Sequence, residues 1–392
     1  MKLKLPSLDD LDVKGKRVLL RVDFNVPLKD GQVTDPMRIR AALPTIRRLL
    51  DGGATVIACS HLGRPKGKVD PKYSMAPVAR LLADELQMPV RLTEAANGPA
   101  EDLETLGAGE VALLENLRYD PREEANDPAF AQELAALADA YVCDAFGAVH
   151  RAHASVAGVP ALLPSAAGLL LEKEVKVLTR LLEGAKSPFV VVLGGSKVSD
   201  KLGIVKNLLG RADNILIGGA MANTFLAAEG IDIGKSRIEA DRLEEVKKIL
   251  AAAREVGVQI ALPDDVVVAE EFSEDAEGRV VDVMQIPGNA MALDIGPSTV
   301  YRFSEWIRIS STILWNGPMG VFEWENFATG TREVAKLVAK AEAFTVVGGG
   351  DSAAALAAFD LEGEVDHLST GGGASLEFLE GKPLPGLVAL SQ

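Results

Sequence analysis

Residues 16–24, KRVLLRVDF, decide the fold of the first part of this chain. This short apolar run is typical of a buried strand. A helical pattern over residues 38–50, a second apolar run over residues 54–60 (ATVIACS) and a helical pattern over residues 76–86 follow it. Strand and helix patterns in alternation predict βαβ units and therefore a parallel sheet.

The alternation continues to about residue 165. Residues 111–116 (VALLEN) and 140–146 (AYVCDAF) have strand patterns, with a helix predicted between them around residues 130–138. Residues 157–166 (AGVPALLPSA) are expected to be irregular. The sequence therefore predicts a first α/β domain over residues 1–168.

A long connecting helix is expected over residues 169–184, because apolar residues recur there at helical spacing. They are Leu170, Leu171, Val175, Leu178, Leu181 and Leu182. The strand and helix alternation then restarts, which predicts a second α/β domain over residues 185–376. Its expected strands lie in residues 189–195, 214–219, 258–269, 311–318 and 344–350, and its first helices in residues 199–209 and 220–229.

Chain length supports the same division. The 392 residues exceed what one hydrophobic core usually organises. We expect the fold class to be α/β, with two Rossmann-like three-layer domains that have parallel sheets and are joined by the long helix and a hinge.

Charge and composition limit the classes of partner that we expect for this chain. A net charge of −15 would repel nucleic acid and anionic membranes, so neither is an expected partner. Cys59 and Cys143 lie in apolar runs without a CxxC partner, which indicates buried thiols in a reducing cytoplasm. We expect no signal peptide and no membrane span, because neither apolar pattern is present.

Basic residues follow several expected strands of the first half. Because parallel strands end at one edge of a sheet, such residues would converge there on a small anion carrying phosphate and carboxylate. The residues in these segments are Arg21, Asp23, Asn25, Arg38, Arg40, His61, Arg64, Arg118, His150, Arg151 and His153.

The corresponding segments of the second half are rich in glycine. Glycines before a helix let backbone N–H groups approach phosphate oxygens, so these segments resemble a nucleotide platform. Gly348, Gly350 and Ala353 also fit the dinucleotide pattern G-x-G-x-x-A, which leaves an NAD-dependent dehydrogenase as an alternative. The phosphate-loop pattern G-x-x-x-x-G-K-[ST] is absent from the sequence, which disfavours an ordinary P-loop enzyme.

Taken in order, these segments resemble the signature blocks of the phosphoglycerate kinase family along nearly the whole chain. They are RVDFNVP (21–27), SHLGRP (60–65), LENLRY (114–119), DAFG-x-x-HRAHAS (144–155), LGG-x-KVSDK (193–201), WNGPMGVFE (315–323), GGGDS (348–352) and STGGGASLEFLEGK (369–382). The departures from the family pattern are small: Ala148 and Val149, Ser196, and Ser352.

This resemblance implies the reversible transfer of a phosphoryl group between 1,3-bisphosphoglycerate and ADP. It implies that the first domain binds the phosphoglycerate through Asp23, Asn25, Arg38, His61, Leu62, Gly63, Arg64, Arg118 and Arg151. It implies that the second domain binds the nucleotide with Mg²⁺ through Lys201, Glu323, Gly349, Gly350, Asp351 and Ser352, with Asp351 nearest the metal. The tail, about residues 377–392, is expected to pack back onto the first domain.

The expected reaction needs neither a protein nucleophile nor a general base, because the attacking and leaving oxygens are both ionised at neutral pH. Positioning and electrostatics would carry catalysis. The candidates for stabilising the migrating group are Arg38, Lys197 and the N–H groups of Gly371, Gly372 and Gly373. With one substrate on each domain, transfer is expected only after the domains close about the connecting helix.

Two alternatives remain at this stage, the dehydrogenase and a non-catalytic binding protein of two lobes. A monomer acting on small molecules is expected.

Overall fold

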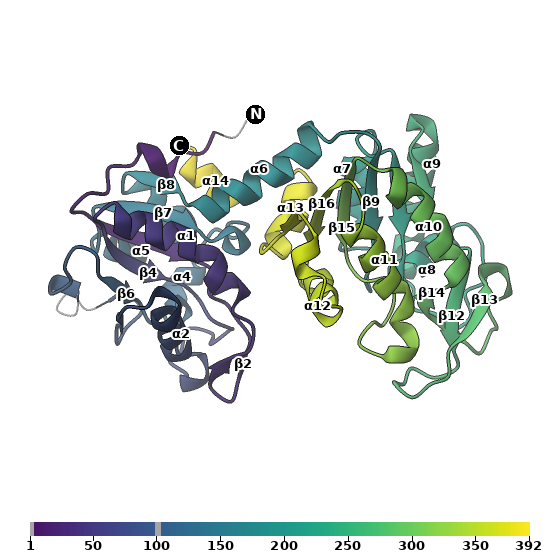
Figure 1. The fold of residues 1–392 in the computed structure, drawn as a ribbon, viewed down its shortest axis with the longest axis horizontal. Helices are drawn as coiled ribbons and strands as arrows, with labels where there is room; N and C mark the ends of the chain where they lie inside the picture. Colours follow the sequence, from purple (N-terminus) through teal and green to yellow (C-terminus); the bar gives the residue numbers. More distant parts are fainter. Residues whose placement is uncertain (1–3, 99–102) are drawn as a thin grey trace. The chain divides into compact units, whose positions relative to one another are not determined.

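The computed structural model describes residues 4–98 and 103–392 of the chain (Figure 1). The chain divides into two compact units. Unit 1 consists of Met1–Lys176 and Pro383–Gln392, and unit 2 of Val177–Lys382. The division falls within helix α6 (Leu169–Glu183), which coincides with the connecting helix expected from the sequence.

Unit 1 is built on a parallel sheet with the strand order β5-β6-β4-β1-β7-β8. Its strands are β1 (Arg17–Val22), β4 (Thr55–Cys59), β5 (Val90–Leu92), β6 (Val111–Leu113), β7 (Ala140–Asp144) and β8 (Ser165–Ala167). Its helices are α1 (Met37–Asp51), α2 (Ala76–Leu86), α4 (Pro121–Glu124), α5 (Pro128–Ala135) and α14 (Pro385–Leu390), and a small hairpin joins β2 (Leu28–Lys29) to β3 (Gln32–Val33). Strand β8 therefore overlaps the end of the segment, residues 157–166, that was expected to be irregular.

Strand β1 shows how the sheet separates its two faces. Val18, Leu20 and Val22 point to one face and join the core that α1 and α2 cover. Arg21 points to the opposite face, where it reaches the π-helix η5 (Ala154–Gly158). The charged side chain of Arg21 is therefore buried on the second face of the sheet. Its neighbours in register are Cys59 on β4 and Cys143 on β7.

The C-terminal segment belongs to unit 1 only from Pro383 onward. Helix α14 packs against η5 and β8, and the N–H of Gly386 donates to the carbonyl of Val149 (2.9 Å). Residues 377–382 stay with unit 2, where α13 (Gly373–Leu379) contacts α7 (Leu202–Leu208).

Unit 2 has its own parallel sheet, with the order β11-β10-β9-β15-β16-β17. Its strands are β9 (Phe189–Leu193), β10 (Asn214–Ile217), β11 (Gln259–Ala261), β15 (Thr312–Asn316), β16 (Phe344–Gly348) and β17 (His367–Leu368). Its other helices are α8 (Gly219–Ala228), α9 (Leu243–Val256), α10 (Pro297–Ile309), α11 (Thr329–Ala339) and α12 (Gly350–Ala358).

Both faces of this sheet are covered. Val190, Val192 and Trp315 share a core with residues of α10, α11 and α12. Val191 and Leu193 point to the other face of the sheet and are equally buried. We therefore assign the remaining helices, α7, α8, α9 and α13, to that face. The predicted fold class, two α/β units with parallel sheets, is therefore confirmed.

One expected strand was wrong. Residues 258–269 form not a single strand but two, because Pro263 lacks the N–H that would continue the ladder. The first, β11, lies at the edge of the parallel sheet. The second, β12 (Asp265–Ala269), pairs with β13 (Arg279–Asp282) and β14 (Met291–Ile295) in a separate antiparallel sheet.

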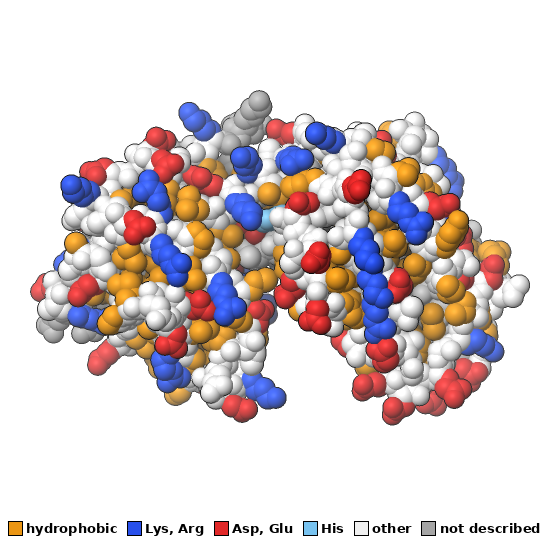
Figure 2. All heavy atoms as spheres, viewed as in Figure 1, with side chains coloured by type: hydrophobic (Ala, Val, Ile, Leu, Met, Phe, Trp, Pro, Cys, Tyr) orange, Lys and Arg blue, Asp and Glu red, His pale blue; other side chains and the backbone are white. Residues whose placement is uncertain are grey.

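On the face seen in Figure 2, Lys and Arg side chains are interspersed with Asp and Glu on each unit. Cys59 and Cys143 are free and buried, as their apolar context predicted. Within the described residues, every helix is too short or too polar to cross a membrane.

Candidate functional site

The polar residues singled out in unit 1 follow the C-terminal ends of its central strands. Asp23 and Asn25 follow β1, His61 to Arg64 follow β4, Arg118 follows β6, and Arg151 follows β7. Because these strands are parallel, all of these segments leave the sheet at one edge.

A set of short hydrogen bonds joins three of these segments. Arg38, in the first turn of α1, donates from Nη1 to Oδ2 of Asp23 (2.7 Å). Asn25 accepts at Oδ1 the N–H of Gly63 (2.8 Å). The carbonyl of Gly63 in turn accepts a hydrogen bond from Nη1 of Arg118 (2.8 Å). The side chain of Arg118 is almost fully buried.

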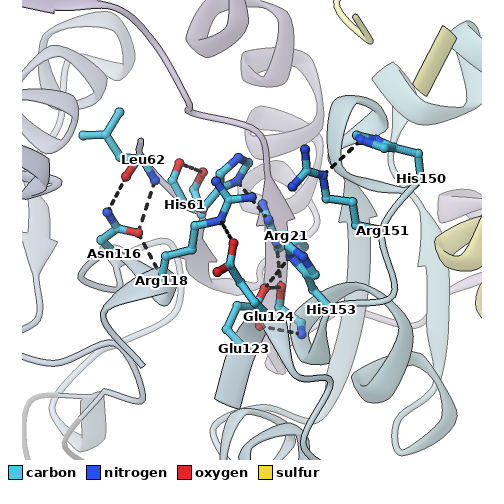
Figure 3. Close-up of polar contacts among 12 residues, drawn as sticks. Arg21, His61, Leu62, Asn116, Arg118, Glu123, Glu124, His150, Arg151 and His153 are labelled. Atoms are coloured by element: carbon cyan, nitrogen blue, oxygen red, sulfur yellow. Dashed lines mark hydrogen bonds and ion pairs between the residues drawn. The ribbon is translucent and has the colours of Figure 1, made fainter. Parts of the chain in front are cut away.

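Asn116 fixes the backbone on which Leu62 and Gly63 lie. Its side chain accepts the N–H of Leu62 (3.2 Å) and donates to the carbonyl of Leu62 (2.7 Å), as Figure 3 shows. It also accepts the N–H of Arg118 (3.1 Å). One buried amide thus sets the spacing between the segments after β4 and β6.

His61 is the electrostatic centre of this cluster. Burial lowers its pKa well below 6.5, and the charges of Arg21, Arg118 and Arg38 lower it further. The imidazole is therefore neutral at neutral pH, and three cationic groups surround it. A chain of net charge −15 has concentrated positive charge at this edge.

Arg64 and Arg151 are exposed. Arg151 donates from Nε to Nε2 of His150 (3.1 Å), and the two lie side by side in Figure 3. Burial lowers the pKa of Arg118, the charge of Glu124 opposes this, and the charge of Arg151 adds to it. Arg151 is thus close enough to contribute to the positive field.

Arg40 does not join the cluster. Its guanidinium pairs with Glu85 (2.8 Å) on the outer side of the α1 and α2 pair and is largely exposed. The reason is helical geometry, since residues two positions apart on α1 face different directions. Grouping Arg40 with Arg38 was therefore wrong.

In unit 2, Lys201 joins the ends of two neighbouring strands. Its Nζ donates to the carbonyl of Gly194 (2.5 Å), after β9, and to that of Asn316 (2.9 Å), at the end of β15. Burial lowers its pKa to about 8, although the charges of Asp351 and Asp200 oppose the shift. Carbonyl oxygens hold the ammonium, and no carboxylate of the described part of the chain forms an ion pair with it.

The loops after β15 and β16 are joined in the same manner. The side chain of Asn316 donates to the carbonyl of Gly348 (2.8 Å), and the N–H of Gly317 donates to Oγ of the buried Ser352 (2.6 Å). Gly349 has φ +93° and leads into α12. Lys201, Gly349, Asp351 and Ser352 therefore gather at one point of the sheet edge.

Lys197, Glu323 and the glycines Gly371 to Gly373 also follow strands of this sheet, namely β9, β15 and β17. Lys197 and Glu323 are exposed. Gly372 has φ +49°, and a side chain built there would meet open space, whereas Gly371 is buried and its N–H donates to Oγ of Ser369 (3.2 Å).

The fit to a magnesium ion depends on the carboxylates. Among residues 4–98 and 103–392, no group of three or more His, Cys, Asp or Glu side chains could enclose a metal. Asp351 stands alone in the first turn of α12. This suits Mg²⁺, which proteins commonly hold through one or two carboxylates together with substrate phosphates.

Sequence reasoning missed the buried partners of these groups. Glu123 and Ser155 are fully buried in unit 1 and bind each other, and Asn116 orders the backbone there. Glu123 lies in the run Asp120–Glu124, where nothing in the sequence distinguishes the buried carboxylate from its exposed neighbours.

Arginines at one parallel-sheet edge and glycine-rich turns with a buried lysine at another are typical of enzymes that transfer phosphoryl groups between anionic substrates.

Comparison with known proteins narrows this class. The family "Phosphoglycerate kinase" matches residues 8–382 of the chain. Relatives named phosphoglycerate kinase from Chloroflexus aurantiacus and Moorella thermoacetica are each 54% identical. The alignments cover 98% of this chain and 98% or 99% of the relative.

Two solved structures of phosphoglycerate kinases also match the fold of this chain. The phosphoglycerate kinase of Coxiella burnetii aligns with a TM-score of 0.90 at 43% identity, covering 99% of each chain. That of Pyrococcus horikoshii OT3 aligns with a TM-score of 0.87 at 36% identity, covering 98% of each.

The chain belongs to the phosphoglycerate kinase family. It is a transferase of glycolysis, a nucleotide-dependent kinase that acts on a carboxyl group. The comparisons do not support the dehydrogenase, although Gly348 and Gly350 do lie at a strand-to-helix turn, nor the non-catalytic binding protein.

Proposed function

We propose that unit 1 binds 3-phosphoglycerate or 1,3-bisphosphoglycerate and that unit 2 binds ATP or ADP with Mg²⁺. The observation that carries the proposal is the concentration of Arg21, Arg38 and Arg118 around the neutral His61 in a strongly acidic chain. Such a field attracts a small multiply charged anion, and the guanidinium groups match both its carboxylate and its phosphate.

The residues proposed to bind phosphoglycerate are those that share this sheet edge. They are Asp23, Asn25, Arg38, His61, Leu62, Gly63, Arg64, Arg118 and Arg151. The exposed Arg64 and Arg151 would contact the ligand most freely, because neither pairs with a carboxylate among residues 4–98 and 103–392.

The residues proposed to bind the nucleotide are Lys201, Glu323, Gly349, Gly350, Asp351 and Ser352. The accessible N–H groups near Gly349 and the ammonium of Lys201 would bind phosphate oxygens. Asp351 would hold Mg²⁺ together with those phosphates, and the ion would neutralise part of their charge.

The transfer itself is proposed to be direct and in line, without a covalent enzyme intermediate. Arg38, Lys197 and the N–H groups of Gly371, Gly372 and Gly373 would stabilise the charge on the equatorial oxygens of the migrating group. The open backbone at Gly372 supports this role.

Because the two substrates are assigned to different units, the reacting oxygens must be brought together by closure of the units. We propose α6 as the hinge element, since the boundary between the units falls within it. Small-angle scattering should show compaction when both substrates are bound; an unchanged radius of gyration with both present would contradict closure.

The proposed partners are small molecules only. The net charge of −15 argues against nucleic acid. The free thiols of Cys59 and Cys143 fit a reducing cytoplasm. A monomer is proposed, because each unit carries its own set of site residues.

A coupled assay of ATP-dependent phosphorylation of 3-phosphoglycerate tests the central assignment. In Arg38→Ala and Lys197→Ala, kcat should fall by about two to three decades, because each loses a donor to the migrating group. Circular dichroism and the melting temperature would show that both variants fold.

The matched control is Arg40→Ala. Arg40 shares the first turns of α1 with Arg38 but pairs with Glu85 at the surface. Its activity should stay within about twofold of the wild type. A wild-type rate for Arg38→Ala or Lys197→Ala would withdraw that residue's catalytic role.

A further inference from the structure

A buried chain of hydrogen bonds lies behind His61 and outside the residues assigned to substrates. Nε of Arg21 donates to Oγ of Ser155 (2.8 Å), and that hydroxyl donates to Oε1 of Glu123 (2.6 Å). The N–H of Ser155 donates to Oε2 of Glu123 (2.9 Å). At its other end, Nη2 of Arg21 lies 3.1 Å from Nδ1 of His61 (Figure 3).

Donor chemistry fixes the state of His61. A guanidinium has only N–H donors, so Nδ1 of His61 must be the acceptor and must carry no proton. The neutral ring then carries its proton on Nε2. No described residue forms a hydrogen bond with Nε2, and this atom is not sealed from solvent. His61 therefore offers one outward N–H donor.

Arg21 itself needs a compensating anion, because it is fully buried. The other carboxylates of this region have partners of their own. Asp23 pairs with Arg38, Glu124 pairs with Arg118 (3.1 Å), and Asp144 accepts the N–H groups of Leu170 and Leu171. Glu123 is left as the counter-charge of Arg21, one hydroxyl away.

The surroundings of Glu123 support this pairing. Burial raises its pKa, but the charge of Arg21, the hydrogen bonds from Ser155 and the charge of Arg118 all favour the carboxylate. His153 lies 3.8 Å away at Nδ1, and burial among Arg21, Arg118 and Arg151 lowers its pKa to about 3. His153 is therefore neutral and leaves the charge of Glu123 to Arg21.

We propose that Glu123 is a positioning residue for phosphoglycerate recognition. Through Ser155 it holds Arg21 in place, and Arg21 holds His61 as the tautomer whose Nε2–H faces the ligand. The proposal rests on the assignment of His61 to substrate binding.

The decisive variant is Glu123→Gln, which keeps the shape and removes the charge. The KM for 3-phosphoglycerate should rise about tenfold, the effect of losing a well-oriented hydrogen bond to a charged ligand. The KM for ATP and the value of kcat should stay within about twofold. The matched control is Glu133→Gln, which changes a partly exposed carboxylate of α5 that pairs with Arg122, and it should match the wild type.

A double-mutant cycle separates positioning from general destabilisation. In a His61→Ala background, Glu123→Gln should have no further effect on the KM for 3-phosphoglycerate. An equal effect in both backgrounds, or no effect of Glu123→Gln alone, would overturn the proposal. If Glu123→Gln does not fold, Ser155→Ala, which removes the bridging hydroxyl, is judged by the same criteria.

Ring ¹⁵N NMR reads the tautomer directly, and the chain has only four histidines. His61, assigned by the loss of its signals in His61→Ala, should be protonated at Nε2 alone in the wild type and a mixture of tautomers in Glu123→Gln. A proton on Nδ1 in the wild type would refute the proposal. An unchanged KM in His61→Ala would instead refute the assignment of His61 to the substrate, so the two failures are distinguishable.

Discussion

Units 1 and 2 have similar parallel sheets but build their anion sites from different material. In unit 1 the site consists of charged side chains that bind one another, with Arg21, Arg118 and Glu123 buried. In unit 2 it consists mainly of backbone, with Lys201 held by carbonyl groups and the turns closed by Asn316 and Ser352.

The difference determines what each unit is sensitive to. A site of buried side chains depends on protonation, because each charge is compensated by a titratable neighbour. A site of backbone groups depends on how closely neighbouring backbone segments approach one another. Glycine permits the closest approach because it has no Cβ. Unit 1 should therefore lose stability as the pH falls, whereas the site of unit 2 should be most sensitive to added methyl groups.

The largest effect should come from Gly194→Ala in unit 2. A Cβ at this position would overlap the carbonyl oxygen of Pro318, a backbone atom that cannot move aside. We expect a loss of about 3 kcal/mol in the free energy of unfolding, at the upper end for an overpacked site, and a marked loss of nucleotide binding. Urea denaturation and ADP titration would measure both.

The control for this variant is Gly363→Ala. Its Cβ would meet no atom within 4 Å and its φ is not positive, so stability should change by less than about 0.5 kcal/mol. If the two alanine variants had equal stability, close backbone approach would not be what shapes the unit 2 site.

A pH change from 7 to 5 should separate the two units. His61 and His153 stay neutral in the fold, while in the unfolded chain they take up protons near pH 6.5. Each therefore lowers the stability of unit 1 by about 1.4 kcal/mol per pH unit below that point. Asp144, with its pKa raised to about 6 by burial, opposes them, which leaves a net loss of about 2.5 kcal/mol.

In unit 2 the sign is reversed. Burial raises the pKa of Asp294 to about 7, so the folded unit binds a proton that the unfolded carboxylate binds only near pH 4. Unit 2 should gain about 2 kcal/mol over the same range. Hydrogen exchange measured separately for peptides of each unit would test this, with Asp294→Asn as the variant that removes the gain. Equal changes in both units would contradict the comparison.

The smallest effect concerns the charge of Lys201 in unit 2. Lys201 has a pKa of about 8, because it is buried, so it loses its charge as the pH rises from 7 to 9. ADP affinity should fall by up to about tenfold, or about 1.4 kcal/mol, across that range. Lys201→Arg, which stays charged, should remove this pH dependence in calorimetric titrations. A fall of the same size in that variant would exclude Lys201 as its source.

The sequence predicted most of the fold because the strands are buried on both faces and read as apolar runs between helical patterns. It failed where a run is interrupted by one residue, as at Pro263, which sends β12 into a separate sheet. Strands of two or three residues, such as β8 and β17, carry too few positions for a pattern to be recognised.

The residues proposed for the site could be chosen from the sequence because most of them follow strands of a parallel sheet. It did not separate Arg38 from Arg40, since that requires knowing which side of α1 is covered by α2. It also did not reveal Glu123, because burial of a carboxylate depends on Arg21 and Ser155, which lie far away along the chain.

Because unit 1 contains helix α14, the two units are completed at different times during synthesis. Unit 2 is one continuous segment, whereas unit 1 needs Pro383–Gln392 to cover Val149 and Val156 beside Gly386. As the chain leaves the ribosome, unit 2 has all of its residues before unit 1 does. The early part of unit 1 must therefore wait, with part of its apolar surface uncovered, through the translation of more than half of the protein.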